Sequence, residues 1–330
     1  MKIKNRKLDH LRICNEQNVE TGAAGFDVVR LAHRALPEID YDSIDLSIKF
    51  LGKRLDYPLI IEAMTGGVPE AEKINKDIAS VAQEYNIGFG VGSQRAAVDD
   101  LKLAETFQVR DVAPGILLIA NLGAVQLNYG YSLKECLAAV DMIEADALAL
   151  HINPLQEAVQ LEGNRNFRGL AEKINSISAK MSKPVIAKEI GCGISLETAK
   201  MLKVAAYDVG GVGGTSWSLV EGIRAGVKDL GAGKTFASWG IPTAESVREV
   251  SKTKIPVIAS GGIRTGIDAA KSLALGASCV GMALPVLRAW SAGGKQGVRE
   301  LLDKFFCELQ VAMFLTGSGN IKELRGKIRE

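Results

Sequence analysis

Polar side chains follow short apolar runs along this chain, and one group combines residue types that can bind a metal. His151, Asn153, Gln156 and Glu157 supply an imidazole, two amides and a carboxylate within one short segment. A zinc site usually needs three or four nitrogen or sulfur ligands, whereas Mg²⁺ takes one or two carboxylates with phosphate oxygens and water. We therefore predict that Glu157 is a magnesium ligand. The alternative for His151 is an ordinary structural histidine.

Two glycine-rich segments are suited to phosphate. Gly261-Gly262-Ile263-Arg264 follows an apolar run and precedes a helical pattern, so free backbone N–H groups and a helix N-terminus can meet an anion, and Arg264 adds a fixed charge. Gly281-Met282 follows the next apolar run. In α/β barrels the last two loops often form a phosphate site. The alternative is that these glycines only make tight turns.

Two further features of the sequence are cationic: a lysine at the end of an apolar run and a basic segment near the start of the chain. Lys188 ends the run Val185-Ile186-Ala187, where a lysine can form a Schiff base, act as a base or lie beside an electron-rich ring. The sequence does not choose among these roles. The segment from Arg6 to His10 is either a solvated tail or, with Arg95 and Mg²⁺, a clamp for a diphosphate.

The elements that must position these residues follow a regular alternation. Eight short runs are apolar at both odd and even positions, as in strands that are buried on both faces. They are 59–63, 87–91, 116–120, 147–151, 185–188, 209–212, 257–259 and 279–283. Helical spacing occupies most of the intervals between them: 70–85, 133–143, 167–181, 196–204, 244–253 and 266–275. This order predicts an α/β fold, a (β/α)₈ TIM barrel with the polar groups at its C-terminal face. An open doubly wound sheet is the alternative, but it lacks an early GxGxxG turn.

We predict one domain over residues 1–330. Residues 1–57 form an N-terminal extension, in which alternation over 44–50 and a turn at Gly52 predict a hairpin that caps the bottom or side of the barrel. Residues 58–316 form the barrel and 317–330 a tail. The long interval between strands six and seven, 215–256, predicts an inserted loop or short helices over the barrel mouth.

Composition excludes several classes of protein. The chain has 330 residues, 47% of them hydrophobic, which excludes intrinsic disorder. Its formal net charge of +2 gives no general attraction to nucleic acid. Five cysteines without a CxxC motif are typical of a reducing compartment, and no signal peptide or membrane span is expected. We expect a soluble cytoplasmic protein.

The motifs together resemble those of one family, type 2 isopentenyl diphosphate isomerase, which is FMN-dependent. The resemblance covers essentially the whole chain. Its motifs are Arg6-Lys7-x-Asp9-His10, Ala63-Met64-Thr65-Gly66-Gly67, Gly92-Ser93-Gln94-Arg95, His151-x-Asn153-x-x-Gln156-Glu157, Lys188-Glu189-x-Gly191-x-Gly193, Gly213-Gly214-Thr215-Ser216-Trp217 and Gly261-Gly262-Ile263-Arg264-Thr265-Gly266. The first and fourth are the most specific together, whereas the last is shared with other flavin barrels.

The resemblance implies an activity and a cofactor site. Such enzymes interconvert isopentenyl and dimethylallyl diphosphate in isoprenoid biosynthesis, with reduced FMN and Mg²⁺ and no net redox change. NADPH is the expected reductant. The residues implied to contact FMN are Ala63, Met64, Thr65, Ser93, Asn121, Lys188, Thr215, Gly261, Gly262, Arg264 and Ala283.

The resemblance also implies a substrate site and an assembly. Residues that hold the diphosphate or the substrate are expected to be Arg6, Lys7, His10, Ser93, Arg95, Asn153 and Gln156, with Mg²⁺ on Glu157. The catalytic group is expected to comprise Gln156, His151 and Lys188. Gln156 is the candidate for relaying a proton, although an amide is a poor acid or base and the residue can instead orient the substrate. The expected partner is the small-molecule diphosphate, and the chain is expected to form a homo-tetramer or octamer.

Three other readings fit the sequence less well. An FMN-dependent oxidoreductase of the 2-hydroxy-acid oxidase type shares the Gly-Gly-Ile-Arg loop but needs a histidine base after a later strand, and no histidine follows His151. A dehydrogenase resembling the IMP enzyme needs a nucleophilic cysteine where this chain has Gly213-Gly214-Thr215. A non-catalytic phosphate-binding barrel does not account for Lys188, His151 and Glu157 at one face.

Overall fold

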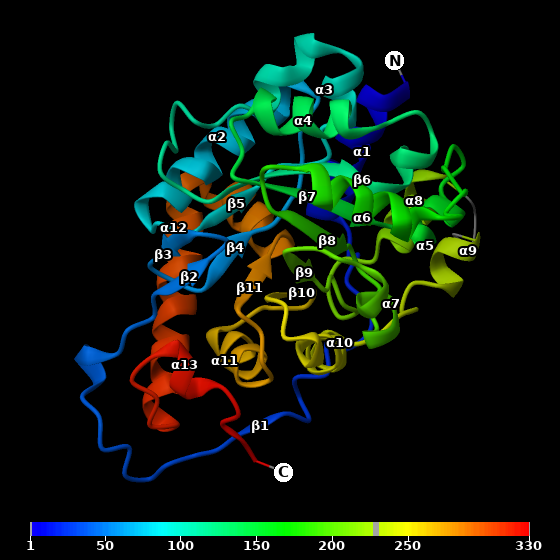
Figure 1. Cartoon of the computed structure of the whole chain (residues 1–330). Coiled ribbons are helices and arrows are strands. Elements are labelled where there is room, and N and C mark those ends of the chain that lie inside the picture. The colour runs from blue at the N-terminus through cyan, green and yellow to red at the C-terminus, as the bar shows by residue number, and fades with distance from the viewer. Residues whose placement is uncertain (1, 227–230, 330) are drawn as a thin grey trace.

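Eight parallel strands close into a ring in the computed structural model, which describes residues 2–226 and 231–329 (Figure 1). The strands are β4 (Leu59–Ile61), β5 (Gly88–Gly90), β6 (Leu118–Gly123), β7 (Ala147–Ile152), β8 (Val185–Glu189), β9 (Ala206–Asp208), β10 (Val257–Ser260) and β11 (Cys279–Met282). The ring closes because β4 pairs with β11 as well as with β5, with Leu59 opposite Val280. The predicted (β/α)₈ barrel is confirmed, and the open sheet is excluded.

Helices surround the ring and bury one face each. They are α2 (Pro69–Glu84), α3 (Arg95–Asp99), α4 (Leu133–Met142), α5 (Pro154–Val159), α6 (Leu170–Lys180), α7 (Leu196–Met201), α10 (Thr243–Val250), α11 (Gly266–Ala274), α12 (Leu284–Leu315, interrupted at Gly293 and Gly294) and α13 (Ile321–Leu324). Short 3₁₀ turns are η1 (Tyr41–Ser43), η2 (Leu101–Phe107), η3 (Ala124–Asn128) and η4 (Ser251–Thr253). Helices α4 and α11 each begin with a capping box, formed by Ser132 with Glu135 and by Thr265 with Asp268. These side chains accept hydrogen bonds from backbone N–H groups that lack partners within the helix.

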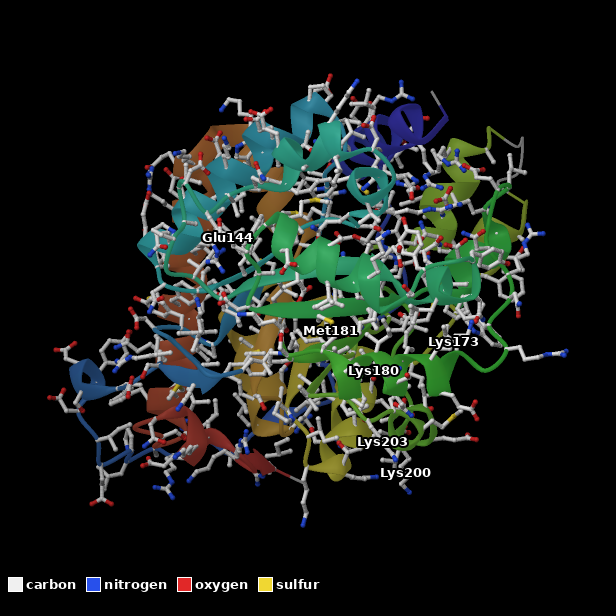
Figure 2. The ribbon with its side chains drawn as sticks, turned by 45° about the horizontal axis from the view of Figure 1, so that its top comes forward. Glu144, Lys173, Lys180, Met181, Lys200 and Lys203 are labelled. Atoms are coloured by element: carbon white, nitrogen blue, oxygen red, sulfur yellow. The ribbon has the colours of Figure 1, made fainter. Side chains whose placement is uncertain are left out.

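The outer side of α6 and α7 carries several exposed lysines. Figure 2 shows Lys180, Lys200 and Lys203 along this side of the barrel, and all three are exposed. None of them lines the cavity described below. These charges therefore belong to the solvated exterior, and the cations of the site come from other elements.

The sixth strand differs from the prediction. It spans Ala206–Asp208 rather than residues 209–212. The predicted run instead enters a glycine-rich loop, where Gly210 and Gly213 have positive φ values of 47° and 115° that are unfavourable in a strand. The correction matters because it places Asp208, rather than Val212, at the end of the strand, next to Lys188 on β8.

The hairpin closes the N-terminal end of the barrel. Strands β2 (Ile48–Phe50) and β3 (Lys53–Leu55) pair antiparallel through a turn with Leu51 and Gly52 at positive φ. Phe50 and Leu55 are buried with interior residues of the ring such as Ile60 and Ile186. The hairpin therefore supplies the bottom layer of the barrel core, as a capping hairpin was predicted to do.

Three helices and the chain ends complete the structure. The insertion contains α8 (Trp217–Arg224) and α9 (Gly231–Thr235) before α10, and residues 227–230 of the predicted insertion lie outside the described part. Helix α1 (Lys2–Glu16) packs against α8, where the rings of His10 and Trp217 lie 5.2 Å apart. Strands β1 (Arg30–Leu31) and β12 (Ile328–Arg329) pair antiparallel, beside the C-terminal end in Figure 1. No helix within the described ranges is both long and apolar enough to cross a membrane.

Candidate active site

A large cavity opens at the C-terminal ends of the barrel strands. Its empty volume is about 1690 Å³, part of it open to solvent. Every residue that the sequence predicts for the site lines it: Arg6, Lys7, His10, Ala63, Met64, Thr65, Ser93, Arg95, Asn121, His151, Asn153, Gln156, Glu157, Lys188, Thr215, Gly261, Gly262, Arg264 and Ala283. The structure brings these residues together, while the role of each stays a prediction.

Helix α1 supplies the cations at the rim. Lys7 Nζ donates to the carbonyl of Ser93 at 2.9 Å and lies 5.7 Å from the centre of the Phe107 ring. Burial, with a smaller contribution from the charge of Arg6, lowers the pKa of Lys7 to about 7. The solvated-tail alternative is therefore wrong, because this helix is docked over the barrel mouth.

Glu221 on α8 is a buried carboxylate that the sequence did not reveal. Its Oε1 accepts from His10 Nε2 at 3.0 Å and from Gln156 Nε2 at 3.0 Å, and its Oε2 accepts from Arg224 at 2.7 Å. Burial alone would raise the pKa of Glu221, but these donors lower it to about 2. Glu221 thus joins the N-terminal helix to Gln156. The insertion pattern gave no signal for it beyond the i,i+3 pair with Arg224.

His151 is held as a neutral acceptor. Its Nδ1 lies 2.9 Å from Oδ1 of Asn121, whose own amide donates to the carbonyl of Val91. Nδ1 must therefore carry the proton, which leaves the lone pair on Nε2. Burial, followed by the charges of Lys188 and Lys7, lowers the pKa of His151 to about 3. At neutral pH this side chain can accept a hydrogen bond in the cavity but has no spare proton to give.

Glu157 is positioned by its neighbours on and after α5. Its Oε1 accepts from the Asn153 amide at 3.1 Å, and its Oε2 accepts from the backbone N–H of Asn164. The same Asn153 amide donates to Gln156 Oε1 at 2.9 Å, and the buried Oδ1 of Asn153 has no hydrogen-bond partner among the described residues.

This donor set restricts the kind of metal site. Within the described ranges no three His, Cys, Asp or Glu side chains gather into a metal centre. One carboxylate and one unpartnered amide oxygen fit Mg²⁺ that takes its other ligands from phosphate and water. They do not fit a closed zinc site.

Lys188 lies in a cluster with two carboxylates that the sequence did not single out. Its Nζ is 2.8 Å from Glu62 Oε2 and also contacts Asp208 Oδ2. Burial opposes the charge of Lys188, but Asp208 and Glu62 outweigh it and raise its pKa. The Schiff-base and base roles both need a neutral amine, so the role beside an electron-rich ring fits this environment best. Asp208 was missed because strand six was placed too late, and Glu62 because it lies within the predicted apolar run 59–63.

The glycine loops after β9 and β10 pack backbone against backbone. A Cβ on Gly261 would lie 2.1 Å from the carbonyl oxygen of Gly211, and one on Gly214 would lie 2.8 Å from the nitrogen of Gly262. Arg264 beside them pairs with Glu20, whose other oxygen lies 3.6 Å from Arg288. These loops, the size of the cavity and the unpartnered buried Oγ1 of Thr65 fit a flavin mononucleotide with its phosphate at the loops.

Comparison with known proteins places this geometry in a family. Residues 171–330 match the model of the FMN-dependent dehydrogenase family. A protein of Nostoc sp. described as isopentenyl-diphosphate delta-isomerase is 49% identical over 328 residues, covering 97% of this chain and 93% of its own length. One of Pyrococcus furiosus with the same description is 48% identical over 334 residues, with 97% and 84% coverage. The chain belongs to the isopentenyl-diphosphate delta-isomerase family. The resemblance to the FMN-dependent type 2 isomerases is thereby confirmed, and the protein is an enzyme of the isomerase class.

Solved structures show how widely this isomerase fold is shared. A variant of flavocytochrome b2 is 18% identical with a TM-score of 0.70, covering 97% of this chain and 82% of that one. A protein of Pediococcus acidilactici described as a lactate oxidase is 18% identical with a TM-score of 0.65, with 95% and 85% coverage. At this identity the likeness shows the fold alone. It therefore gives no support to the oxidase alternative, which lacks its histidine.

Proposed function

We propose that this protein interconverts isopentenyl diphosphate and dimethylallyl diphosphate, using FMN reduced by NADPH together with Mg²⁺ and without net redox change. One observation carries the proposal. A single cavity is lined by two groups of residues suited to binding anions, the cations of α1 with Arg95 and the glycine loops with Arg264. A cofactor phosphate and a substrate diphosphate need two such groups.

The cofactor would use the loops and the floor of the cavity. Gly261, Gly262 and Arg264 would hold its phosphate, and Lys188 would lie beside its ring. When bound in the reduced form, FMN supplies an electron-rich ring that can exchange a proton with the substrate and stabilise positive charge. The charged Lys188, fixed by its two carboxylates, favours an electron-rich partner at this position.

The substrate would lie between the ring and α1. Arg6, Lys7 and Arg95 would bind the diphosphate directly, and Glu157 would bind it through Mg²⁺. The neutral His151 would accept a hydrogen bond. Gln156 would face the substrate in an orientation set by its hydrogen bond to Glu221, 3.0 Å long. In this arrangement Gln156 orients the substrate or relays a proton, while the buried walls exclude water.

The activity is tested by an anaerobic assay in D₂O with reduced FMN, Mg²⁺ and isopentenyl diphosphate. We expect deuterated dimethylallyl diphosphate and no net oxidation of the flavin. If a folded, flavin-loaded protein gives no conversion, the proposal is wrong. An aerobic assay of the flavin-loaded protein with a 2-hydroxy acid then tests the oxidase alternative.

The division of roles predicts a specific effect for Glu157→Gln. Loss of the carboxylate should weaken Mg²⁺-dependent substrate binding, raising KM for the diphosphate at least about tenfold, because the variant removes the negative charge that Glu157 offers to Mg²⁺. FMN should stay bound, since Glu157 takes no part in the glycine loops. Titration of Mg²⁺ in the assay and the visible spectrum of the retained flavin measure the two effects.

The matched control is Glu172→Gln on the exposed side of α6, which should change neither quantity. Release of flavin from Glu157→Gln would contradict the assignment of this residue to the metal.

We further propose a homo-tetramer or octamer in the cytoplasm. Sedimentation velocity of the purified protein tests the assembly, and a monomer would overturn it.

A further inference from the structure

Glu62 and Lys188 line the main cavity and form, with Asp208, a buried cluster of charges that substrate binding does not explain. Glu62, Asp208 and Lys188 have exposed fractions of only 6%, 1% and 8%. Glu62 directly follows β4, Asp208 ends β9 and Lys188 lies on β8. Three different strands of the barrel therefore position the cluster. Ser260 on β10 donates to Asp208 Oδ1, and the backbone N–H of Gly210 donates to Ser260 at 3.1 Å. The cluster is therefore a built site rather than a chance contact.

The charges in this cluster do not balance. Two carboxylates share one ammonium, which leaves a net negative charge inside the barrel if both are ionised. An uncompensated buried charge is costly, and a carboxyl group usually takes up a proton instead. Asp208 contacts Lys188 and accepts from Ser260, whereas Oε1 of Glu62 is buried and has no hydrogen-bond partner in the described part of the chain. Glu62 is consequently the carboxyl group on which the proton should lie.

The surroundings of Glu62 leave room for that proton to move. A second, small pocket adjoins it and is lined by Glu62, Asn121, Lys188 and Asp208 among apolar residues. Four polar groups around such a space are what a buried water requires. On the other side, a Cβ on Gly281 would lie 2.4 Å from Glu62 Oε1, so glycine is needed there to admit the carboxyl group.

We propose that Glu62 is a positioning residue that carries an exchangeable proton and so adjusts the charge beneath the cofactor ring. When the cavity holds a neutral ring, the carboxyl group of Glu62 ionises readily. When two electrons enter the ring from dithionite or a nicotinamide hydride donor and make it negative, Glu62 takes one proton from solvent to form an O–H bond. It returns that proton on reoxidation. This inference rests on FMN binding as proposed above.

The titrating groups around Glu62 are consistent with this exchange. Lys188 and Asp208 face it directly, Cys279 on β11 lies close enough to be affected by both carboxylates, and His151 faces Lys188. Burial first, and then the charge of Asp208, raise the pKa of Glu62 to about 7 against the opposing effect of Lys188. Neither Cys279, whose pKa burial raises well above its usual value, nor the neutral His151 competes for the proton near neutrality.

The test compares the midpoint potential of bound FMN against pH in the wild type, Glu62→Gln and the exposed control Glu172→Gln. One extra proton per two electrons adds about 30 mV per pH unit to the slope. We expect the wild type and the control to have this extra slope above neutrality, and Glu62→Gln to lack it. At alkaline pH, where Glu62 is ionised, the midpoint potential of the wild type should be lower than that of Glu62→Gln. In acid the two potentials should converge. Equal slopes in flavin-loaded wild type and Glu62→Gln would overturn the proposal.

A second measurement does not need the cofactor. Infrared difference spectra of the flavin-free full chain should show a protonated-carboxyl band that disappears as pH rises through neutrality. The band should be absent from Glu62→Gln and should vanish at lower pH in Asp208→Asn, because Glu62 then has Lys188 to itself. A wild type without this band would refute the proton on Glu62. Failure to bind FMN or to isomerise the substrate would refute the proposed function instead, and the infrared result would still decide the cluster.

Discussion

Burial determines which ionisable side chains of the cavity are charged. Glu221 keeps its charge because three donors surround it, whereas His151 is neutral because burial and two nearby cations oppose protonation. Lys7 lies between these cases, with a pKa of about 7. The residue types alone would suggest a charged lysine, a half-charged histidine and an ordinary glutamate, so the electrostatics of the site come from the packing around each group.

Lys7→Arg should alter the pH profile of substrate capture. Lys7 loses its proton as pH rises through about 7, so its attraction for a diphosphate weakens and kcat/KM of the wild type should fall above neutrality. An arginine stays charged throughout this range, so the variant should show a smaller fall. The measurement is kcat/KM between pH 6 and 9, with exposed Lys200→Arg as the control. Identical profiles would show that Lys7 does not titrate in the free enzyme.

Glu221→Gln should lower both stability and kcat. The variant leaves Arg224 and His10 without their buried anion, which costs about 3 kcal/mol, and it frees Gln156 from its fixed orientation. Thermal unfolding and the separate values of kcat and KM measure the two effects. Glu162→Gln is the matched control, because its 45% exposed side chain pairs with the same Arg224 and should cost less than about 1 kcal/mol. A kcat unchanged in Glu221→Gln would argue against the positioning of Gln156.

Sequence reasoning found the groups at strand ends but not their buried partners. His151, Glu157 and Lys188 follow apolar runs, so a barrel topology alone gathers them at one face. Glu62, Asp208 and Glu221 were missed because a carboxylate becomes informative only when the cation or donor opposite it is known. Those partners come from other strands or from an insertion, and their pairing is set by the three-dimensional structure.

At the scale of elements, the loops after the strands are as closely built as the strands themselves. Gly261 has a φ of 97° and Gly262 a φ of 73°, conformations that other residues rarely adopt. The loops after β9 and β10 also touch through their backbones, which leaves no room for a side chain. Their shape is therefore set by this close packing, as the proposed anion site would need.

Gly261→Ala should abolish FMN binding by displacing these loops. Its new Cβ would meet the carbonyl oxygen of Gly211 at 2.1 Å, in addition to the strain at positive φ. Gly130→Ala separates the two effects, because φ there is 96° but no atom lies within 4 Å of the new Cβ. We expect the control to lose about 1 kcal/mol of stability and to keep FMN. Flavin fluorescence titration and thermal unfolding measure both variants, and full FMN affinity in Gly261→Ala would contradict the loop assignment.

The error at strand six shows where element prediction fails. Residues 204–212 are apolar except for Asp208 and the glycines, so hydrophobicity alone does not locate the end of the strand. A charged residue in the run favoured a later start. In the structure Asp208 is tolerated inside the barrel because Lys188 neutralises it, and that compensation is invisible in the sequence.

At the scale of the whole molecule, the two ends of the barrel have separate tasks. The β2–β3 hairpin fills the bottom with Phe50 and Leu55, whereas the cavity occupies the top. Stability at one end and chemistry at the other are consequently separable, as is general for this architecture.

Leu55→Ala should therefore reduce stability without altering the site. Leu55 is fully buried, and truncation of such a leucine costs about 2–5 kcal/mol. Urea unfolding should show this loss, while kcat per mole of folded enzyme stays unchanged. The control Leu36→Ala, at a side chain with 73% exposure, should leave both quantities as in the wild type. A large fall in kcat for folded Leu55→Ala would show that the two ends are coupled.

Closure of the ring by β4 and β11 has a consequence for synthesis on the ribosome. The first and last barrel strands pair, so the contact between Leu59 and Val280 cannot form until residue 280 has been translated. Until then both strands flanking the gap have unpaired edges, which invite association with other chains. Pairing across so long a sequence separation is also slow to form. A nascent chain should consequently rely on chaperones until release, and a truncated product should be degraded rather than persist as a partly active enzyme.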